Sequence, residues 1–200
     1  MQKSILLEMS DFHKELQAIF MTEKDPQLKL IACKALCNLS LDFGHQLVRD
    51  ESFLSQLCEL TYPAVDSEIK VVCCFTLKNL LFKSKPGVRD TVMKVLTYQH
   101  LLELLDDREP VDPLTKKVQE QALMMYRNLF CSGSYLDIQL VLTESGPELL
   151  EKLANILKNG SESLVVHTLY VLSSIASGNQ KQKKIVMEDR FLGRALEMLR

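Results

Sequence analysis

An internal repeat limits what this chain can fold into more than any other feature of its sequence. Four segments align when four anchor positions are superposed, and successive anchors are separated by 41, 49 and 46 residues. The anchors are Asn38, Asn79, Asn128 and Ser174. A period in the forties is typical of chains that stack one supersecondary unit several times. The repeat therefore predicts a stacked architecture.

The copies agree at five positions relative to the anchor. Each has an apolar residue ten before and one after its anchor, a small residue six before it, and leucine or tyrosine two before it. Thirteen before each anchor stands a residue type that starts helices, namely Asp25, Asp66, Thr115 or Ser161. The spacing predicts an amphipathic helix, and the small position lets neighbouring helices cross closely. In the second copy the expected buried face is Ile69, Cys73, Thr76, Leu77 and Leu80.

Helices are expected along the whole chain, because the β-branched residues fall at helical rather than alternating spacing. Gly44 is expected to end one helix, and Gly146-Pro147 to separate two others. The expected helices cover residues 4–22, 27–41, 45–50, 52–60, 66–81, 88–96, 99–105, 114–131, 135–145, 147–157, 161–177, 181–189 and 191–200. Three helices per copy, short, medium and long, predict an all-α solenoid of four to five repeats. We expect one domain over residues 1–200, with the last repeat incomplete.

Charge and composition argue against several classes of function. The formal net charge is −2, and the only basic run, residues 181–184, is best explained as a solvated helical turn. A nucleic-acid binder is therefore not expected. Residues 163–180 lack charged side chains, but their polar residues and Gly178 argue against a membrane span. We expect a protein of the cytoplasm and nucleus.

No pattern of residues points to catalysis. The six cysteines lie in apolar helical runs without a CxxC pair, which is typical of small core residues in a reducing compartment. The four histidines are scattered through the chain, and there is no nucleophile–histidine arrangement and no glycine-rich phosphate loop. We therefore expect no catalytic residues, no cofactor, no metal and no small-molecule ligand.

Several motifs resemble those of armadillo repeats. These are ALCNL (35–39), TLKNL (76–80) and YRNL (126–129), with ESGPELL (144–150) resembling the turn into a second helix. The segments CNLSLDF (37–43), ESFLSQLCELT (51–61), KNLLF (78–82), LLELLDD (101–107) and LSSIASG (172–178) are similar to the C-terminal part of the armadillo subunit of the CTLH/GID ubiquitin ligase. Ser174 departs from the pattern by replacing the asparagine.

This resemblance implies a right-handed α–α superhelix of the armadillo type and a non-catalytic scaffold. Members of the ligase family hold a substrate receptor on one side and the RING and CTLH-domain subunits on the other. A free-standing peptide-binding adaptor in signalling or transport is the alternative. Nuclear-import adaptors share the fold but carry Trp four residues before the Asn, where this chain has Lys34, Phe75 and Met124. A receptor for nuclear-localisation signals is therefore disfavoured.

The third helices of stacked armadillo units line the inner face of the superhelix, so residues off their buried stripe are groove candidates. These candidates are Lys34, Asn38, Phe75, Lys78, Asn79, Met124, Arg127, Asn128, His167 and Tyr170. A row of Asn amides can bind the backbone of an extended peptide, and Lys78 and Arg127 can hold an acidic segment. Alternatively, the asparagines bridge adjacent repeats. The loop 106–113 is either a tolerated surface insertion or a partner-binding loop.

Overall fold

The structure is a computed structural model that describes residues 2–63, 67–106, 108, 112–131 and 134–197. All regular secondary structure in these residues is α-helical, which confirms the expected fold class. The chain divides into two compact units, residues 1–80 with 84–95 and residues 81–83 with 96–200. Each unit is described by itself, and the single domain over residues 1–200 stays a prediction.

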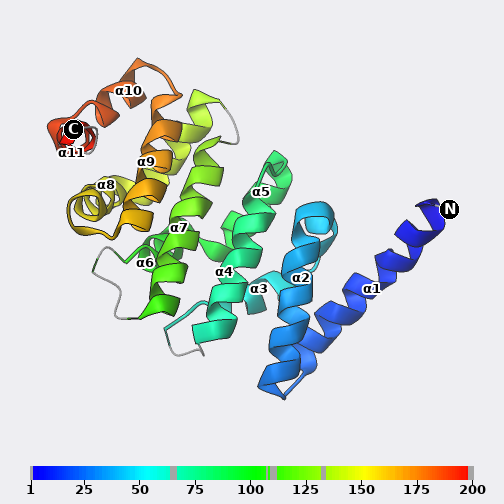
Figure 1. Cartoon of the computed structure of the whole chain (residues 1–200). Helices are drawn as coiled ribbons and strands as arrows, with labels where there is room; N and C mark the ends of the chain where they lie inside the picture. The colour runs from blue at the N-terminus through cyan, green and yellow to red at the C-terminus, as the bar shows by residue number, and fades with distance from the viewer. Residues whose placement is uncertain (1, 64–66, 107, 109–111, 132–133, 198–200) are drawn as a thin grey trace. The chain divides into compact units, whose positions relative to one another are not determined.

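The described residues of the first unit form five helices (Figure 1): α1 (Gln2–Thr22), α2 (Pro26–Leu47), α3 (Glu51–Glu59), α4 (Ser67–Leu81) and α5 (Pro86–Leu96). Its core joins α1 to α3 through Phe20 and Phe53, whose rings meet edge to face with centroids 5.6 Å apart. Neither side chain is exposed. The face predicted for α4 is buried as expected, at Ile69, Cys73, Thr76, Leu77 and Leu80.

Helix α2 does not end at Gly44 as the sequence predicts. Its backbone kinks one residue earlier, at Phe43 (φ −111°, ψ 15°), and one more turn continues to Leu47. The expected short helix over 45–50 is thereby reduced to that turn. The physical reason lies at Asp50, which has an extended backbone because its side chain accepts hydrogen bonds from the N–H groups of Ser52 and Phe53 and caps α3.

The predicted capping residues fare differently. Asp25 is confirmed, because its side chain accepts from the Gln27 N–H with Pro26 at the first helical position. The prediction that Thr115 caps its helix is wrong. The capping residue is Asp112, whose side chain accepts from the Leu114 and Thr115 N–H groups at 2.7 and 2.9 Å. Ser161 occupies the cap position of its helix but makes no capping hydrogen bond. Asp66 lies outside the described residues.

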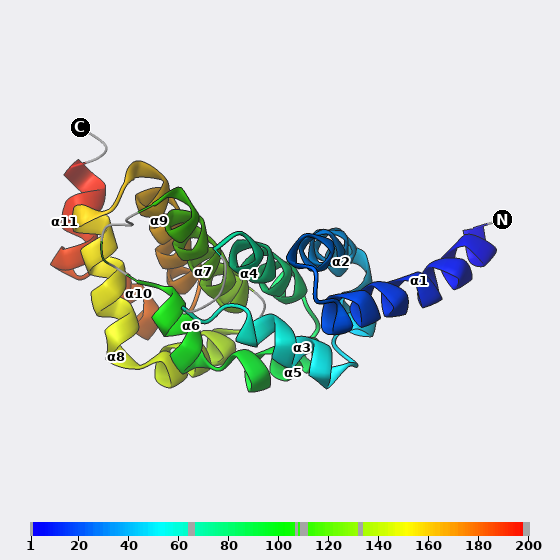
Figure 2. The ribbon, with the colours of Figure 1, turned by 90° about the horizontal axis from the view of Figure 1, so that it is seen from below.

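In the second unit, the part of the chain that the structure describes forms six helices (Figure 2): α6 (Tyr98–Leu104), α7 (Pro113–Cys131), α8 (Tyr135–Asn159), α9 (Glu162–Ala176), α10 (Gln180–Val186) and α11 (Asp189–Glu197). Large side chains fill its core, among them Tyr126, Phe130 and Phe191. The side-chain amide of Gln182 donates to the Tyr135 carbonyl oxygen at 3.0 Å, which ties α10 to the start of α8. No helix of the described chain is both long and apolar enough to cross a membrane.

Helix α8 is broken where the sequence predicts a joint. Gly146 has φ 67° and ψ −178°, a backbone conformation that only glycine adopts without strain, and Pro147 follows it. The expected separation into residues 135–145 and 147–157 is therefore confirmed, although the second half continues to Asn159. Helix α8 contacts α6, α7, α9 and α11.

Gly146→Ala is expected to lower the free energy of unfolding by about 1–2 kcal/mol, because alanine must hold the strained backbone. A steric clash of the new methyl group does not contribute, since nothing lies within 4 Å of a Cβ added at Gly146. Chemical denaturation followed by circular dichroism measures the effect. Gly193→Ala is the matched control: it also has open space and lies inside α11, so it should stabilise the chain slightly. Equal effects of the two changes would contradict the backbone explanation.

Candidate protein-binding faces of the third helices

The long helices α2, α4, α7 and α9 contain the four repeat anchors and all ten groove candidates. In the first unit, Lys34 of α2 and Glu68 of α4 form an ion pair with 2.7 Å between Nζ and Oε1. Both side chains are about half exposed, at 50% and 53%. Asn38 is exposed on α2. The structure therefore brings Lys34 to a carboxylate that the sequence reasoning did not include.

Asn79 is used inside the first unit rather than presented on its surface. Its side chain is buried, and its amide donates to the Cys37 carbonyl oxygen at 3.0 Å, which links α4 to α2. The Asn79 side-chain oxygen accepts from Lys78 Nζ at 2.6 Å. At this position the bridging alternative holds, so the anchors do not form a uniform row of exposed amides.

Lys78 and Phe75, both half-buried, lie on α4 next to this bridge. The Lys78 ammonium lies 5.3 Å from the centroid of the Phe75 ring, within the range of a cation–π contact. Burial lowers the pKa of Lys78, and the nearby Cys37 thiol opposes the shift. Burial also raises the pKa of Cys37. The Lys78 ammonium therefore contacts two side chains of its own helix, the Phe75 ring and the Asn79 amide oxygen.

In the second unit, α7 and α9 lie side by side and are joined by three contacts at one constant separation in sequence (Figures 1 and 2). Ser163 Oγ donates to Glu120 Oε1 at 2.7 Å, the Arg127 guanidinium lies 4.7 Å from the Tyr170 ring centroid, and Cys131 Sγ lies 3.0 Å from Ser174 Oγ. Each pair is 43 residues apart. We call these three contacts the α7–α9 ladder. Its constant offset requires two helices that run in the same direction and in register.

The ladder places Ser174 opposite Cys131, one turn beyond Asn128, so aligned anchors need not face each other. Asn128 is half-buried. The ladder also shows what the sequence reasoning missed, namely Glu120 and Ser163, which contact each other across the two helices. Residues 120 and 127 of α7 and residues 163 and 170 of α9 share an interval of seven, but the register that pairs them comes from the packing of the two helices.

His167 and Met124 lie between the two polar ends of this face, and both are half-buried. The pKa of His167 is lowered, mainly by burial; Glu120 acts to raise it and Arg127 to lower it further. The imidazole is therefore neutral at pH 7. Its Nδ1 atom is buried and has no hydrogen-bond partner among the described residues. We call the surface formed by Glu120, Met124 and Arg127 of α7 with Ser163, Val166, His167 and Tyr170 of α9 the α7–α9 face. Its middle is uncharged, with Glu120 at one end and Arg127 at the other.

Comparison with known proteins finds relatives of low sequence identity and solved structures with a similar fold. No family model matches the chain. A zebrafish (Danio rerio) protein named "Armadillo repeat-containing protein 8" is 25% identical over 96% of this chain. A mouse (Mus musculus) protein of the same name is 24% identical over 83% of it. The aligned regions cover 28% and 24% of these relatives, so the chain spans about a quarter of their length.

Among solved structures, the "Designed armadillo repeat protein YIII(Dq.V1)4CPAF in complex with peptide (KR)4" matches 92% of this chain and 72% of its own, with a TM-score of 0.72 and 22% identity. The chain has the armadillo-repeat fold. The motifs ALCNL, TLKNL and YRNL lie on α2, α4 and α7, and the assignment of these helices and of α9 as armadillo third helices stays a prediction.

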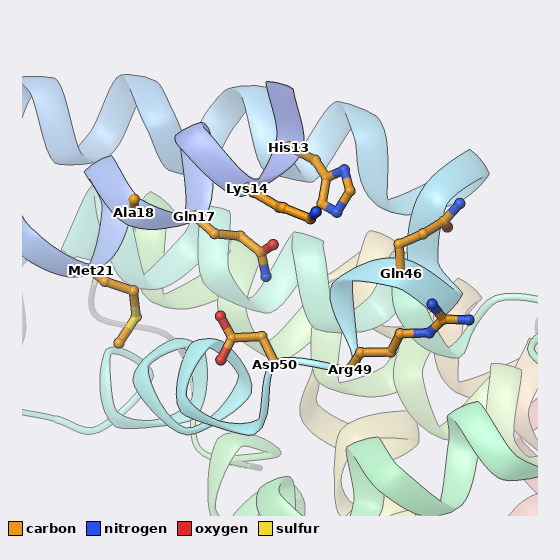
Figure 3. A pocket seen from close by; sticks show the side chains of 8 residues that line it. All are labelled: His13, Lys14, Gln17, Ala18, Met21, Gln46, Arg49 and Asp50. Carbon is orange, nitrogen blue, oxygen red and sulfur yellow. The ribbon is translucent and has the colours of Figure 1, made fainter. Parts of the chain in front are cut away.

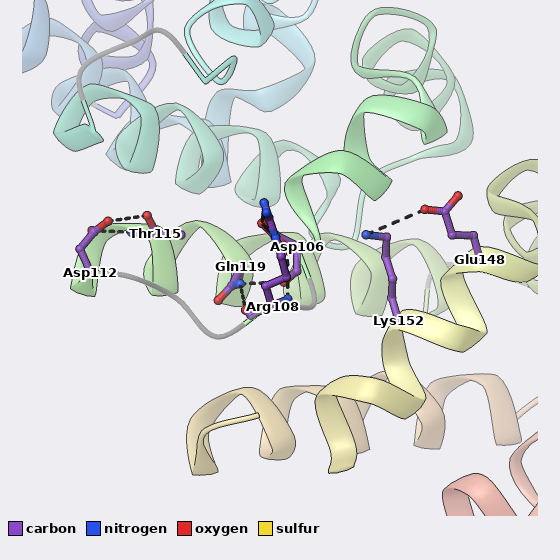
Figure 4. A network of polar contacts seen from close by, with 7 residues as sticks. All are labelled: Asp106, Arg108, Asp112, Thr115, Gln119, Glu148 and Lys152. Atoms are coloured by element: carbon purple, nitrogen blue, oxygen red, sulfur yellow. Dashed lines mark hydrogen bonds and ion pairs between the residues drawn. The ribbon is translucent and has the colours of Figure 1, made fainter. Parts of the chain in front are cut away.

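The loop between α6 and α7 lies within the longest interval between anchors, the 49 residues from Asn79 to Asn128. Polar contacts hold both ends of this loop (Figure 4). The buried Gln119 amide donates to the carbonyl oxygens of Asp106 and Arg108 at 2.7 and 2.9 Å. Arg108 forms an ion pair with Asp106 at 2.6 Å, and Asp112 caps α7. Residues 107 and 109–111 lie outside the described residues, so a partner-binding role for the loop stays a hypothesis.

Acid is expected to weaken this loop anchor. The hydrogen bond from Arg108 holds the pKa of Asp106 below its ordinary value of 3.8, partly opposed by burial. The stabilisation is therefore present above about pH 4 and is lost as the pH falls toward the lower folded pKa. Thermal melts from pH 7 to pH 2 should show wild type losing its advantage over Asp106→Asn in this range. The same substitution at the exposed Asp42 is the control, and a constant difference at Asp106 would contradict the ion pair.

A cavity of about 460 Å³ lies in the first unit of the armadillo chain, between α1 and the connection from α2 to α3 (Figure 3). It is lined by His13, Lys14, Gln17, Ala18, Met21, Gln46, Arg49 and Asp50. Gln17 points toward Asp50, whose carboxylate already caps α3. The lining mixes cationic and anionic side chains, so its chemistry selects no ligand class. Among the residues that the structure describes, no group of three His, Cys, Asp or Glu side chains could hold a metal ion.

The cysteines of the armadillo chain separate into a buried group and a surface residue. Cys33 and Cys73, on neighbouring third helices, have their Sγ atoms 3.7 Å apart and are fully buried. Burial raises the pKa of Cys58 and of Cys74 to about 12. All six cysteines are free, and Cys131 is the one classed as exposed. Most of the thiols therefore act as small core residues, in agreement with the sequence analysis.

Proposed function

We propose that this chain is a non-catalytic protein-interaction scaffold that helps to hold the substrate receptor in a CTLH/GID-type E3 ubiquitin ligase complex, which directs substrates to proteasomal degradation. The observation that carries the proposal is the similarity to proteins named "Armadillo repeat-containing protein 8" over 96% of the chain. The motif resemblance to the armadillo subunit of that ligase supports the same assignment. The partners are then the receptor subunit and the RING and CTLH-domain subunits, in the cytoplasm and nucleus.

The contact with the receptor is proposed to run through the third-helix faces. Lys78 and Arg127 each lie against an aromatic ring, at 5.3 and 4.7 Å. A cation that is already held by a ring loses less side-chain freedom when a carboxylate binds to it. Because Asn79 is buried, recognition relies on these charged side chains rather than on a row of amides that binds peptide backbone.

The test is affinity purification of the tagged chain from cells, followed by mass spectrometry. Subunits with RING and CTLH domains are expected to co-purify with the wild-type chain. Arg127→Glu is expected to reduce recovery of the receptor subunit several-fold, because a repulsive carboxylate replaces the attracting guanidinium. Lys181→Glu, on the exposed first turn of α10, is the matched charge reversal and should leave recovery unchanged. The absence of ligase subunits from the wild-type purification would refute the proposal.

A peptide-binding adaptor in signalling or transport is the second candidate. One designed armadillo repeat protein that matches 92% of this chain is named as a complex with the peptide (KR)4, which favours peptide recognition by this fold without any ligase. The same purification separates the two candidates, since an adaptor is expected to recover signalling or transport proteins and no RING or CTLH-domain subunit.

A further inference from the structure

The α7–α9 face has two oppositely charged ends at a fixed separation. Glu120 and Arg127 lie seven residues apart on α7, which is two helical turns or about 10.5 Å along the axis. Their partners Ser163 and Tyr170 are also seven residues apart on α9. Each charged side chain is thus held by a contact from the neighbouring helix. The two ends of the face are pre-organised before any partner binds.

The region between the two ends is apolar or neutral. Val166 is 39% exposed and Tyr170 is 48% exposed on α9, while Met124 is half-buried on α7. His167 lies between Glu120 and Arg127 and adds no charge at neutral pH. A partner that fits this face must therefore offer a cation at one end, an apolar contact in the middle and an anion at the other end.

The separation of the charged ends matches a helical partner rather than a β-strand. Side chains on one side of an extended strand recur at about 6.7 and 13.4 Å, and neither distance matches two helical turns. Residues seven apart on a helix lie on the same side and about 10.5 Å apart, as Glu120 and Arg127 do. Helix-in-groove binding presents its contacts with this spacing.

The first unit lacks the same pair of charged ends. Glu68, near the start of α4, is neutralised by Lys34 at 2.7 Å, so its carboxylate is already paired. Lys78, toward the other end of α4, is ten residues from Glu68, so these two charges do not repeat the spacing of seven. The contrast assigns the charge pattern to the α7–α9 face specifically, rather than to armadillo third helices in general.

We propose that the α7–α9 face binds an amphipathic helix of a partner protein that carries Lys or Arg at one position, apolar residues one turn on, and Asp or Glu seven residues from the first. The basic residue contacts Glu120, and the acidic residue contacts Arg127. The apolar residues cover Met124, Val166 and the ring of His167. The inference rests on the proposed scaffold function and specifies the chemistry of the partner segment.

Two synthetic helical peptides of about 18 residues test the spacing directly. Both contain one Lys, two Leu at the third and fourth positions after it, and one Glu in an alanine-rich background. In the first peptide Glu is seven positions after Lys, and in the second it is nine positions after Lys, on the opposite side of the helix. Fluorescence anisotropy with the whole chain should show about tenfold tighter binding of the first peptide. Equal binding, or no binding of either peptide, would overturn the proposal.

Charge reversal in the protein gives a second readout that a general electrostatic attraction does not reproduce. The Arg127→Glu variant should have lower affinity than wild type for the Lys/Glu peptide. It should have higher affinity than wild type for a Lys/Lys peptide with the same spacing of seven. The double variant Glu120→Lys with Arg127→Glu should recover the Lys/Glu peptide, because the peptide helix can bind end for end. Circular dichroism confirms that the variants fold. A double variant as weak as Arg127→Glu alone would overturn the proposal.

The peptide experiment and the co-purification can fail separately. If ligase subunits co-purify but the two spacing isomers bind equally, the scaffold function stands and the helix-binding face is wrong. If the spacing isomers differ as expected but no ligase subunit co-purifies, the face binds a helix from a partner outside the ligase, and the proposed function is wrong.

Discussion

Replacing Phe20 by alanine is expected to lower the free energy of unfolding by about 3–5 kcal/mol, the range for a fully buried aromatic side chain. Phe20 has no exposed surface and meets Phe53 edge to face, so its loss leaves a cavity between α1 and α3. Lys29 Nζ, 6.0 Å from the ring centroid, loses its contact as well. The expected fall in Tm is about 10 °C for a chain of this length.

Phe12→Ala is the control for this change, because it removes the same side chain from the same helix. Phe12 is 48% exposed, so its loss should alter stability by less than about 0.5 kcal/mol. Chemical denaturation of the two variants measures the difference. If both variants lost the same stability, α1 would not be held to the first unit by the Phe20–Phe53 contact.

The second large effect is expected at Asn79. Asn79→Ala removes the hydrogen bond that links α4 to the Cys37 carbonyl oxygen and the oxygen that accepts from Lys78. Because the amide is buried, the expected cost is about 2–3 kcal/mol of unfolding free energy. The matched change Asn38→Ala, at the preceding anchor, affects an exposed side chain and should cost almost nothing.

This pair of variants decides between the two roles that the sequence leaves open for the asparagines. Substitution of a residue that bridges repeats lowers the folding stability of the chain. Substitution of a groove residue lowers the affinity for a partner and leaves the folding stability unchanged. A stable Asn79→Ala chain with weakened partner binding would show that the bridge is incidental. Thermal melts and the affinity purification together provide both measurements.

Local patterns predicted most of the helices, because helix formation depends on spacing that a single segment contains. The buried face of α4 and the joint at Gly146-Pro147 follow from apolar periodicity and from glycine and proline chemistry. The sequence predicts that this helix ends at Gly44, whereas α2 is interrupted at Phe43 and continues to Leu47, before Asp50 caps α3. Thr115 was misassigned for a related reason, as an earlier aspartate takes the capping role.

The contacts of the candidate site residues could not be predicted from the sequence, because they depend on tertiary packing. Nothing in the segment around Asn79 indicates that its amide reaches Cys37, which is 42 residues earlier. The pairing of Glu120 with Ser163 and of Arg127 with Tyr170 depends on the register between α7 and α9. The spacing of 46 residues between the anchors Asn128 and Ser174 differs by three from the offset of 43 that the contacts show.

The exposed Cys131 gives the chain a built-in labelling position. Its sulfur lies beside Ser174 at one end of the α7–α9 ladder, while burial protects the Cys33 and Cys73 thiols. A maleimide dye applied briefly to the native protein should therefore attach first at Cys131, without any cysteine having to be removed. Fluorescence from that dye would report on events at the α7–α9 face in the otherwise unaltered chain, and could follow partner association in real time.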